Sequence, residues 1–384
     1  MFRYLTAGES HGPALVAVAE GLPAGLSVVR DDLAAELARR RLGFGRGGRM
    51  KLEQDELEFL GGVRHGISIG SPIAILVRNT EFDQKWSEEM NPYSGHPIKP
   101  LTTPRPGHAD LVGMMKYDLK DARNILERAS ARETAARTVV GYLSKVFLAA
   151  LGVDVLSHVV EIGGVSATRD AVPSPADIER IDASPVRVFE PETEKRMIAE
   201  IEAARADRDT LGGVVEVVAH GLVPGIGSHV HADRRLDARL AEALMSIQAM
   251  KGVEVGDGFE TARRRGSEAH DEIFRGDDGY RRETNRAGGT EGGMSIGGVL
   301  RVRVAMKPIS TVPKSLRTVD VASGESDREF YERSDVVAVP AAGVVAEQMV
   351  AIVLAQEIQR KFGGDTIGDV VDAWDRYRSR LERF

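Results

Sequence analysis

The chain of 384 residues contains no cysteine, and aromatic residues make up only 5% of it. The missing cysteine excludes disulfide bonds, thiolate metal ligands, iron–sulfur clusters and a cysteine nucleophile. Glycine, in contrast, is abundant, with 41 residues, or about 11% against a usual ~7%. This combination indicates many tight turns and close approaches of the backbone, as around a bound ligand.

A strong charge and a long apolar run are also lacking. Lys and Arg number 51 and Asp and Glu 58, which gives a net charge of −7 and a pI near 5.8. Proteins that coat nucleic acid are usually basic overall, so no nucleic-acid partner is expected. The longest apolar run, 336–346, is broken by Pro340 and is far shorter than the roughly 20 residues that span a bilayer. The first residues lack a signal-peptide core, and we expect a cytoplasmic protein without a membrane partner.

Hydrophobic periodicity predicts a mixture of helices and strands. Helices are expected over 31–41, 124–151, 236–250 and 344–362, with an acidic helix that ends near 208. Strands are expected over 57–60, 73–77 and 299–306, and the alternation in the last predicts a half-exposed strand. A proline-rich loop is expected over 91–110 and a surface excursion over 173–191.

The tripeptide Ser-Ile-Gly occurs twice, at 68–70 and at 295–297, each time before an expected strand. A repeated β-turn-β unit would explain the recurrence, and chance similarity is the alternative. Three matching residues do not decide between them.

The densest positive segment spans 39–51 and has no acidic residue. Its cations are Arg39, Arg40, Arg41, Arg46, Arg49 and Lys51. Intervening glycines would let several guanidinium groups converge on one anion, and Arg suits a bidentate grip on phosphate or carboxylate. The alternative is a solvated loop after a helix, where cations are also favourable. A G-x-G-x-x-G match at 43–48 has no strand before it and no apolar helix after it, so a dinucleotide fingerprint is not supported.

Two histidines lie in turns that contain glycine: His11 within 8–12 and His108 within 104–110. Histidine has a reference pKa of about 6.5 and exchanges protons near neutrality, so both are candidate acids. An ordinary turn histidine is the alternative for each. The segment 229–233 holds two histidines and an aspartate, but the metal-site signal is poor and no metal is assigned.

Arg128 and Arg132 are four residues apart and share a helix face. Ser130 and Glu133 have capping-box spacing. A helix that begins at Ser130 would direct free backbone N–H groups and both arginines at one anion. The alternative is an exposed face balanced by Glu127 and Glu133.

Two later segments also carry candidate chemistry. Residues 307–311 end a strand with a cation and two hydroxyls, which suits phosphate. Asp335 lies just before an apolar stretch, and a buried carboxylate is costly unless it is paired or used. Arg333 could be its partner.

Together these segments resemble one family, the chorismate synthases, nearly from end to end. The family's signature stretches are matched at 6–12, 128–134 and 333–335, with further matches at 104–110, 246–249, 251–254 and 307–308. Several separated motifs in the right order are far more specific than any one of them.

The resemblance implies an α+β fold: a β-α-β sandwich with long central helices between antiparallel sheets, in a single domain over 1–384 and a homotetramer. The family's lyases convert 5-enolpyruvylshikimate 3-phosphate to chorismate and phosphate by trans 1,4-elimination. This is the last shared step of the shikimate pathway to aromatic amino acids, and it needs reduced FMN without net redox change. Members that reduce their own flavin with NADPH generally carry insertions. This chain is compact, so an external flavin reductase is expected, with NADPH as the alternative reductant source.

The resemblance also implies roles for individual residues. His11 would be an acid toward the leaving phosphate or the flavin, His108 an acid toward the reduced flavin, and Asp335 would help to move a proton at the flavin N5. The expected substrate-binding residues are Ser10, Arg40, Arg46, Arg49, Arg105, Arg132 and Arg333, of which Arg40 and Arg46 are also linked to NADP. The expected FMN-binding residues are Arg128, Ala129, Ser130, Gln248, Ala249, Gly292, Lys307, Pro308, Ile309, Ser310, Thr311 and Arg333.

Two other classes stay open from the residues. A non-catalytic anion- or RNA-binding protein would use 39–51 and show a steep salt dependence of affinity. A phosphohydrolase or kinase would depend on metal or turn over ATP. The missing Walker lysine motif, the acidic pI and the lack of a convincing metal cluster weigh against both.

Overall fold

The first of two large antiparallel sheets is built from the N-terminal part of the chain. The computed structural model describes all residues except 46–55, 170, 277–278 and 331–334. The strands are β1 (Arg3–Gly8), β2 (Ala14–Glu20), β3 (Glu56–Gly61) and β6 (Ile73–Arg78), in the order β1-β2-β6-β3. Every second residue of β2 and β6 is buried, so one face of the sheet points inward. The predicted strands at 57–60 and 73–77 are confirmed.

The second large sheet is covered on both faces. Its strands are β7 (Asp154–Ile162), β8 (Val165–Ser166), β9 (Gly213–His220), β10 (Met250–Val255) and β15 (Leu300–Met306), in the order β10-β15-β9-β7-β8. Leu156 and Val218 pack against Ile181, which belongs to the segment 173–191. That segment is therefore not a mere surface excursion, because it covers the outer face of this sheet.

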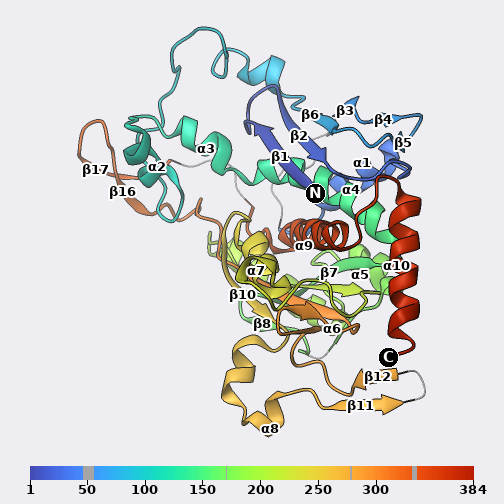
Figure 1. Cartoon of the computed structure of the whole chain (residues 1–384). Coiled ribbons are helices and arrows are strands. Elements are labelled where there is room, and N and C mark those ends of the chain that lie inside the picture. The colour runs from blue at the N-terminus through green and yellow to red at the C-terminus, as the bar shows by residue number, and fades with distance from the viewer. Residues whose placement is uncertain (46–55, 170, 277–278, 331–334) are drawn as a thin grey trace.

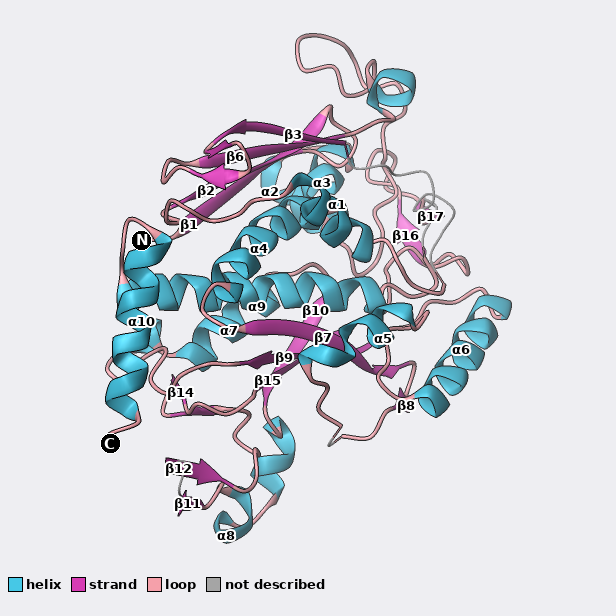
Figure 2. Cartoon of the chain, turned by 90° about the vertical axis from the view of Figure 1, so that its right-hand side faces the viewer, coloured by secondary structure: helices cyan, strands magenta, loops and turns pink. Residues whose placement is uncertain are grey.

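Two long helices lie between the sheets, as Figures 1 and 2 show. Helix α4 (Thr134–Ala149) contacts β2, α9 (Val339–Phe362) contacts β7 and β9, and the two helices contact each other. They cross closely at Gly141, where a Cβ would lie 2.3 Å from Cβ of Gln348. The expected α+β class, with helices and antiparallel sheets, is confirmed.

The remaining elements connect or flank these layers. The helices are α1 (Arg30–Arg39), α2 (Asp110–Tyr117), α3 (Arg123–Ala129), α5 (Ile178–Ala183), α6 (Pro191–Ala206), α7 (Leu236–Met245), α8 (Gly266–Ala269) and α10 (Ile367–Leu381). The short strands are β4 (Val63–Arg64), β5 (Ile67–Ser68), β11 (Ile273–Gly276), β12 (Gly279–Arg282), β13 (Thr290–Glu291), β14 (Met294–Ser295), β16 (Arg317–Val319) and β17 (Ser326–Arg328). Helices α1 and α6 confirm the predictions for 31–41 and for the acidic helix.

The Ser-Ile-Gly recurrence marks two equivalent structural units. The order β1-β2-β6-β3 in one sheet corresponds to β7-β9-β15-β10 in the other. Ser68 and Ser295 each use Oγ to donate to one carbonyl and to accept from an N–H three residues farther along. Ser68 Oγ donates to Pro23 O at 2.7 Å and accepts from Leu26 N at 2.9 Å. Ser295 Oγ donates to Val223 O at 2.6 Å and accepts from Ile226 N at 2.9 Å. The predicted repeated β-turn-β unit is confirmed.

The predicted helix over 124–151 is wrong in its continuity. Ser130 is extended, with φ −66° and ψ 140°, and separates α3 from a 3₁₀ turn, η3 (Ala131–Glu133), and then α4. Its Oγ caps η3 by accepting from Arg132 N at 3.3 Å. Two other boundaries also differ, because α7 ends at Met245 and α9 already begins at Val339.

The prediction that 299–306 is half-exposed is also wrong. Arg301 and Arg303 of β15 are 5% and 6% exposed and pair with Glu216 of β9 at 3.1 and 2.8 Å. His158 Nε2 lies 3.1 Å from the same carboxylate. Burial alone would raise the pKa of Glu216, but these hydrogen bonds and charges lower it to about 2. The alternating cations are buried because an anion on the neighbouring strand compensates them.

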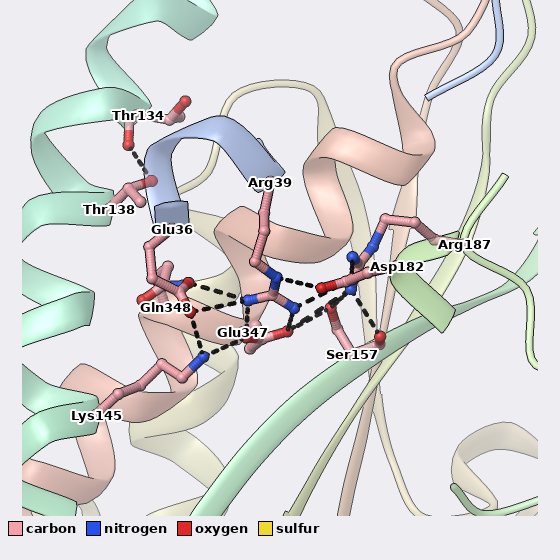
Figure 3. A network of polar contacts seen from close by, with 10 residues as sticks. All are labelled: Glu36, Arg39, Thr134, Thr138, Lys145, Ser157, Asp182, Arg187, Glu347 and Gln348. Atoms are coloured by element: carbon pink, nitrogen blue, oxygen red, sulfur yellow. Dashed lines mark hydrogen bonds and ion pairs between the residues drawn. The ribbon is translucent and has the colours of Figure 1, made fainter. Parts of the chain in front are cut away.

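Helix α9 is long and apolar enough to cross a membrane by length and composition, yet 94% of its most apolar window is buried inside the fold. It is therefore a core helix. A polar network interrupts it at Glu347, which is fully buried and faces Arg39 and Lys145 (Figure 3). This network ties α9 to the end of α1 and to α4.

Candidate active site

The turn after β1 meets the junction of α3 and η3, and this contact fixes the first candidate histidine. Ser10 N donates to Glu127 O, and Ser10 Oγ donates to Ser130 Oγ, both at 3.0 Å. His11 is 3% exposed. Its backbone N–H donates to Glu127 Oε2 at 2.7 Å, and its ring Nδ1 lies 2.8 Å from Glu127 Oε1. An ionised carboxylate at this position would accept the contact from a protonated Nδ1.

Cations and polar groups gather around Glu133 beside this turn. Its Oε2 accepts from Arg137 Nε at 2.8 Å and from Gln248 Nε2 at 3.2 Å. Arg128 Nη1 donates to Gly8 O at 2.7 Å. The structure thus brings Arg128 and Gln248, both expected at FMN, to the turn that carries the first histidine.

Three expected substrate cations are buried in the described part of the chain: Arg40, Arg105 and Arg132. Arg132 lies in η3 and is 8% exposed, and Arg40 is the C-cap of α1 and is 5% exposed. Arg132 belongs to the Ser10 group, because Ser130 Oγ bonds both to Ser10 Oγ and to Arg132 N.

The second candidate histidine is held by a different carboxylate. His108 Nδ1 contacts Asp110 Oδ1, and Arg105 donates to Asp110 Oδ2 through Nε at 2.8 Å. Asp110 is fully buried. Burial by itself would raise its pKa, but the hydrogen bonds from His108 and Arg105 hold it well below the usual range. Arg105, expected to bind substrate, therefore also neutralises the anion that orients His108.

Residues 307–311 join the His108 loop to the Gln248 segment. Lys307 N donates to Ala249 O at 3.0 Å, and Lys307 Nζ donates to Gly107 O. Arg105 Nη1 donates to Thr311 Oγ1 at 3.3 Å. Burial and the nearby charge of Lys251 lower the pKa of Lys307. Three segments expected to bind ligand are thus connected by direct contacts.

Asp335 lies beside the start of the arginine-rich segment. Val336 N donates to Gly45 O, and Leu211 N donates to Val336 O, both at 2.9 Å. The neighbouring Thr210 donates from Oγ1 to Ile309 O at 2.9 Å. Asp335 is therefore linked through 210–211 to the 307–311 segment.

Arg46, Arg49 and Arg333 lie outside the described residues. Gly292 lies in the turn between β13 and β14, where Leu236 N donates to Gly293 O.

The segment 229–233 is an exposed loop that leads into the 3₁₀ turn η5 (Ala232–Arg234), and His231 Nδ1 lies 2.7 Å from Asp233 Oδ1 there. In the described part of the chain, no group of three or more His, Asp or Glu side chains could hold a metal ion.

Sequence reasoning missed the carboxylates that hold the two histidines. Glu127 was considered only as a charge that balances Arg128, and Asp110 only as the end of the His108 segment. The spacing of Asp110 two residues after His108 is a local signal that could have suggested the pair. Glu127 is 116 residues from His11, so no local pattern could have found it.

These features are those of an α+β enzyme with one buried and one half-buried histidine among cations. A family model described as chorismate synthase matches residues 2–359. Chorismate synthases of Acidothermus cellulolyticus and Thermobifida fusca are 64% and 62% identical, with 96% and 97% of both chains covered. A crystal structure of chorismate synthase is similar with a TM-score of 0.80 and 41% identity, covering 100% of this chain and 99% of the other.

The chain therefore belongs to the chorismate synthase family. It is a lyase of the shikimate pathway, with the activity classified as EC 4.2.3.5.

Proposed function

We propose that this chain converts 5-enolpyruvylshikimate 3-phosphate to chorismate and phosphate by trans 1,4-elimination, with reduced FMN and no net redox change. The observation that carries the proposal is that the turn at 8–12 contacts 127–133, which in turn contacts 246–249. Hydrogen bonds join Ser10 to Ser130, His11 to Glu127, Arg128 to Gly8 O, and Gln248 to Glu133. These pairs are linked by backbone bonds from Ser10 to Glu127 and from Glu133 to Ser130, and by Thr6 Oγ1 between Arg128 and Glu133.

The residues expected at FMN fit a flavin in their chemistry. Gln248 Oε1 is buried and has no hydrogen-bond partner among the described residues, so it is available to accept from an N–H group of a ligand. Arg128 and Lys307 supply positive charge for phosphate or for a reduced, anionic ring. When bound, reduced FMN supplies the electronic chemistry that assists the departure of phosphate.

The protein's own groups would bind, orient and move protons. Arg105 and Arg132 bind the substrate's phosphate or carboxylates, together with Arg40 and the arginines outside the described residues. His11 donates a proton toward the leaving phosphate, His108 faces the reduced cofactor, and Asp335 takes part in proton transfer. A positioned acid typically contributes about 10²–10⁴-fold, and fixed cations stabilise the charge that develops on the phosphate.

We further propose that the two sheets and the helices between them form the family's β-α-β sandwich as a single domain over 1–384. The contacts of α4 with β2 and of α9 with β7 support this architecture. We propose a homotetramer as well. Leu5 and Leu60 lie on the outer face of the first sheet and are 69% and 54% exposed to solvent. Association of several copies of the chain through this face would remove these apolar side chains from water. We expect a cytoplasmic enzyme.

We propose an external source of reduced flavin, with NADPH at Arg40 and Arg46 as the alternative. An assay that supplies NADPH and oxidised FMN without a reductase distinguishes the two. Turnover in that assay would contradict the external source.

The main test is anaerobic turnover of the enolpyruvyl substrate with a small amount of reduced FMN. We expect many turnovers per flavin, with phosphate and chorismate released one to one, and none with oxidised FMN alone. Phosphate release without flavin would indicate a hydrolase instead. Oxidation of one FMN per chorismate would overturn the redox-neutral mechanism even if the product is correct.

A further inference from the structure

The strongest unused feature of the site is the double contact between Glu127 and His11. Both oxygens of one carboxylate contact the same residue: Oε2 accepts from the backbone N–H, and Oε1 lies 2.8 Å from the ring Nδ1. Both side chains are about as buried as the core, at 2% and 3% exposure. A buried carboxylate carries a large desolvation cost, so such a placement indicates a specific role.

The surroundings restrict the His11 ring further. The Trp86 ring, at the end of the short π-helix η2 (Phe82–Trp86), lies 4.1 Å from the imidazole centroid at a tilt of 41°. Arg123 Nη1 is 3.6 Å from Glu127 Oε1, and its guanidinium lies 5.2 Å from the Trp86 centroid. The ring is thus covered by Trp86 while its Nδ1 edge is held by Glu127.

We propose that Glu127 is a positioning residue for His11: it holds the ring by the proton on Nδ1 and directs Nε2 toward the substrate's phosphate. The proton given to the phosphate is the second proton of the cationic ring, on Nε2, and its departure leaves the neutral ring with hydrogen on Nδ1. The inference rests on the proposed function, in which His11 is the acid. Glu127 acts through His11 and does not itself touch the substrate.

A carboxylate is required by the geometry. In Glu127→Gln, the amide oxygen could still accept from one N–H of His11. The amide nitrogen, however, is a donor and would face the second N–H where an acceptor now lies. The turn or the ring must then move, or the ring must shift its proton from Nδ1 to Nε2 so that Nδ1 can accept from the amide. In each case the Nδ1–H is no longer held as it is in the wild type.

The experiment compares Glu127→Gln, His11→Ala and the double variant in the reduced-FMN assay. Because a positioned acid is worth about 10²–10⁴-fold, Glu127→Gln should lower kcat about tenfold to a thousandfold with little change in KM. In the His11→Ala background, the same substitution should have no further effect on kcat, because groups that act as a unit are not additive. An independent loss in that background would overturn the proposal.

Glu216→Gln is the matched control. Glu216 is fully buried and also faces a histidine, His158, but it lies in the second sheet with Arg301 and Arg303. We expect this variant to lose stability while its folded fraction keeps the wild-type kcat. An equal loss of kcat in Glu216→Gln and Glu127→Gln would reduce Glu127 to a structural role and contradict the proposal.

A spectroscopic measurement keeps the proposal testable if Glu127→Gln does not fold. Ring nitrogen chemical shifts of His11 in the wild type report which nitrogen carries hydrogen. Hydrogen on Nδ1, in the neutral or the cationic ring, supports the proposal, and a neutral ring with hydrogen only on Nε2 overturns it. A wild type that does not turn over with reduced FMN refutes the proposed function, whereas an active wild type with an unaffected Glu127→Gln refutes only this inference.

Discussion

Glu347 Oε1 lies 2.7 Å from Arg39 Nη1, so a fully buried carboxylate in the core helix α9 is compensated by the last residue of α1. Lys145 Nζ bonds to the same oxygen at 2.7 Å, and Ser157 Oγ donates to the other at 2.9 Å. Burial alone would raise the pKa of Glu347, but the nearby charges of Arg39 and Lys145 hold it far below its usual 4.5. The anion is therefore part of how α1, α4, α9 and β7 are joined.

Glu347→Gln should lower the free energy of unfolding by about 1.5–3 kcal/mol, because charge-assisted hydrogen bonds are lost while Arg39 and Lys145 keep only Glu36 and Asp182 as anionic partners. The folded pKa is depressed, so the stabilisation is fully present above the unfolded value near 4.5 and is lost as pH falls toward the folded value. Urea unfolding of wild type and variant at several pH values measures this difference. Glu58→Gln is the control, since the exposed Glu58–Arg78 pair should contribute only about 0–1 kcal/mol. A difference that grows on acidification would contradict the assignment.

The close crossing of α4 and α9 gives a second stability prediction. Gly141→Ala would place a methyl group 2.3 Å from Gln348 Cβ, and overpacking of this kind costs about 1–3 kcal/mol. The melting temperature should fall accordingly. Gly266→Ala is the control, because nothing lies within 4 Å of a Cβ there and the change should be nearly neutral. Equal melting temperatures for both variants would show that α9 can move aside without cost.

Local patterns predicted the elements whose conformation depends on their own residues. The buried alternation of β6 and the apolar spacing of α1 are both visible in the sequence. The break at Ser130 is only partly visible: its capping-box spacing with Glu133 indicates a helix start, and its hydroxyl does accept from Arg132 N, but the bond of the same hydroxyl to Ser10 Oγ, 120 residues away, has no local signal. Likewise, the alternation of Arg301 and Arg303 predicts exposure until Glu216 is known to lie opposite them on β9. Such pairings depend on the tertiary fold and leave no local pattern.

The same limit applies to the candidate site. The resemblance pointed to both histidines and to several cations as candidate site residues, because those residues lie in contiguous motifs. It did not identify Glu127, whose role depends on an approach of the α3 helix to the turn after β1. It also treated Arg105 as a substrate ligand, whereas the structure adds its ion pair with Asp110.

The proposed homotetramer predicts that a charge on the first sheet's outer face changes the assembly. Leu5 is 69% exposed and lies opposite Val18 in the β1–β2 register. Leu5→Glu would place a carboxylate in the contact and should lower the mass measured by sedimentation. Val230→Glu is the control, because Val230 is 67% exposed in a loop far from β1 in sequence. A full-mass assembly in Leu5→Glu would exclude this face as the interface.

The last prediction concerns Asp110, which serves His108 and Arg105 at once. Asp110 accepts from Arg105 N at 3.1 Å and Nε at 2.8 Å, and it contacts His108 Nδ1. In Asp110→Asn, an amide N–H₂ replaces one acceptor, so one of these donors loses its partner. The depressed pKa of Asp110 keeps the carboxylate ionised down to strongly acidic pH, so in the wild type this anion orients His108 across the whole working range.

We expect Asp110→Asn to lower kcat about a hundredfold or more. A general acid in a fixed position typically raises the rate about 10²–10⁴-fold, and His108 would lose most of this effect once its orientation is no longer fixed. KM for the enolpyruvyl substrate should rise as well, because Arg105 loses the anion that fixes its guanidinium. Asp271→Asn is the control: Asp271 is also buried and accepts from Thr284 Oγ1 and two backbone N–H groups. A higher KM with unchanged kcat would mean that Asp110 serves Arg105 alone and that His108 does not depend on it.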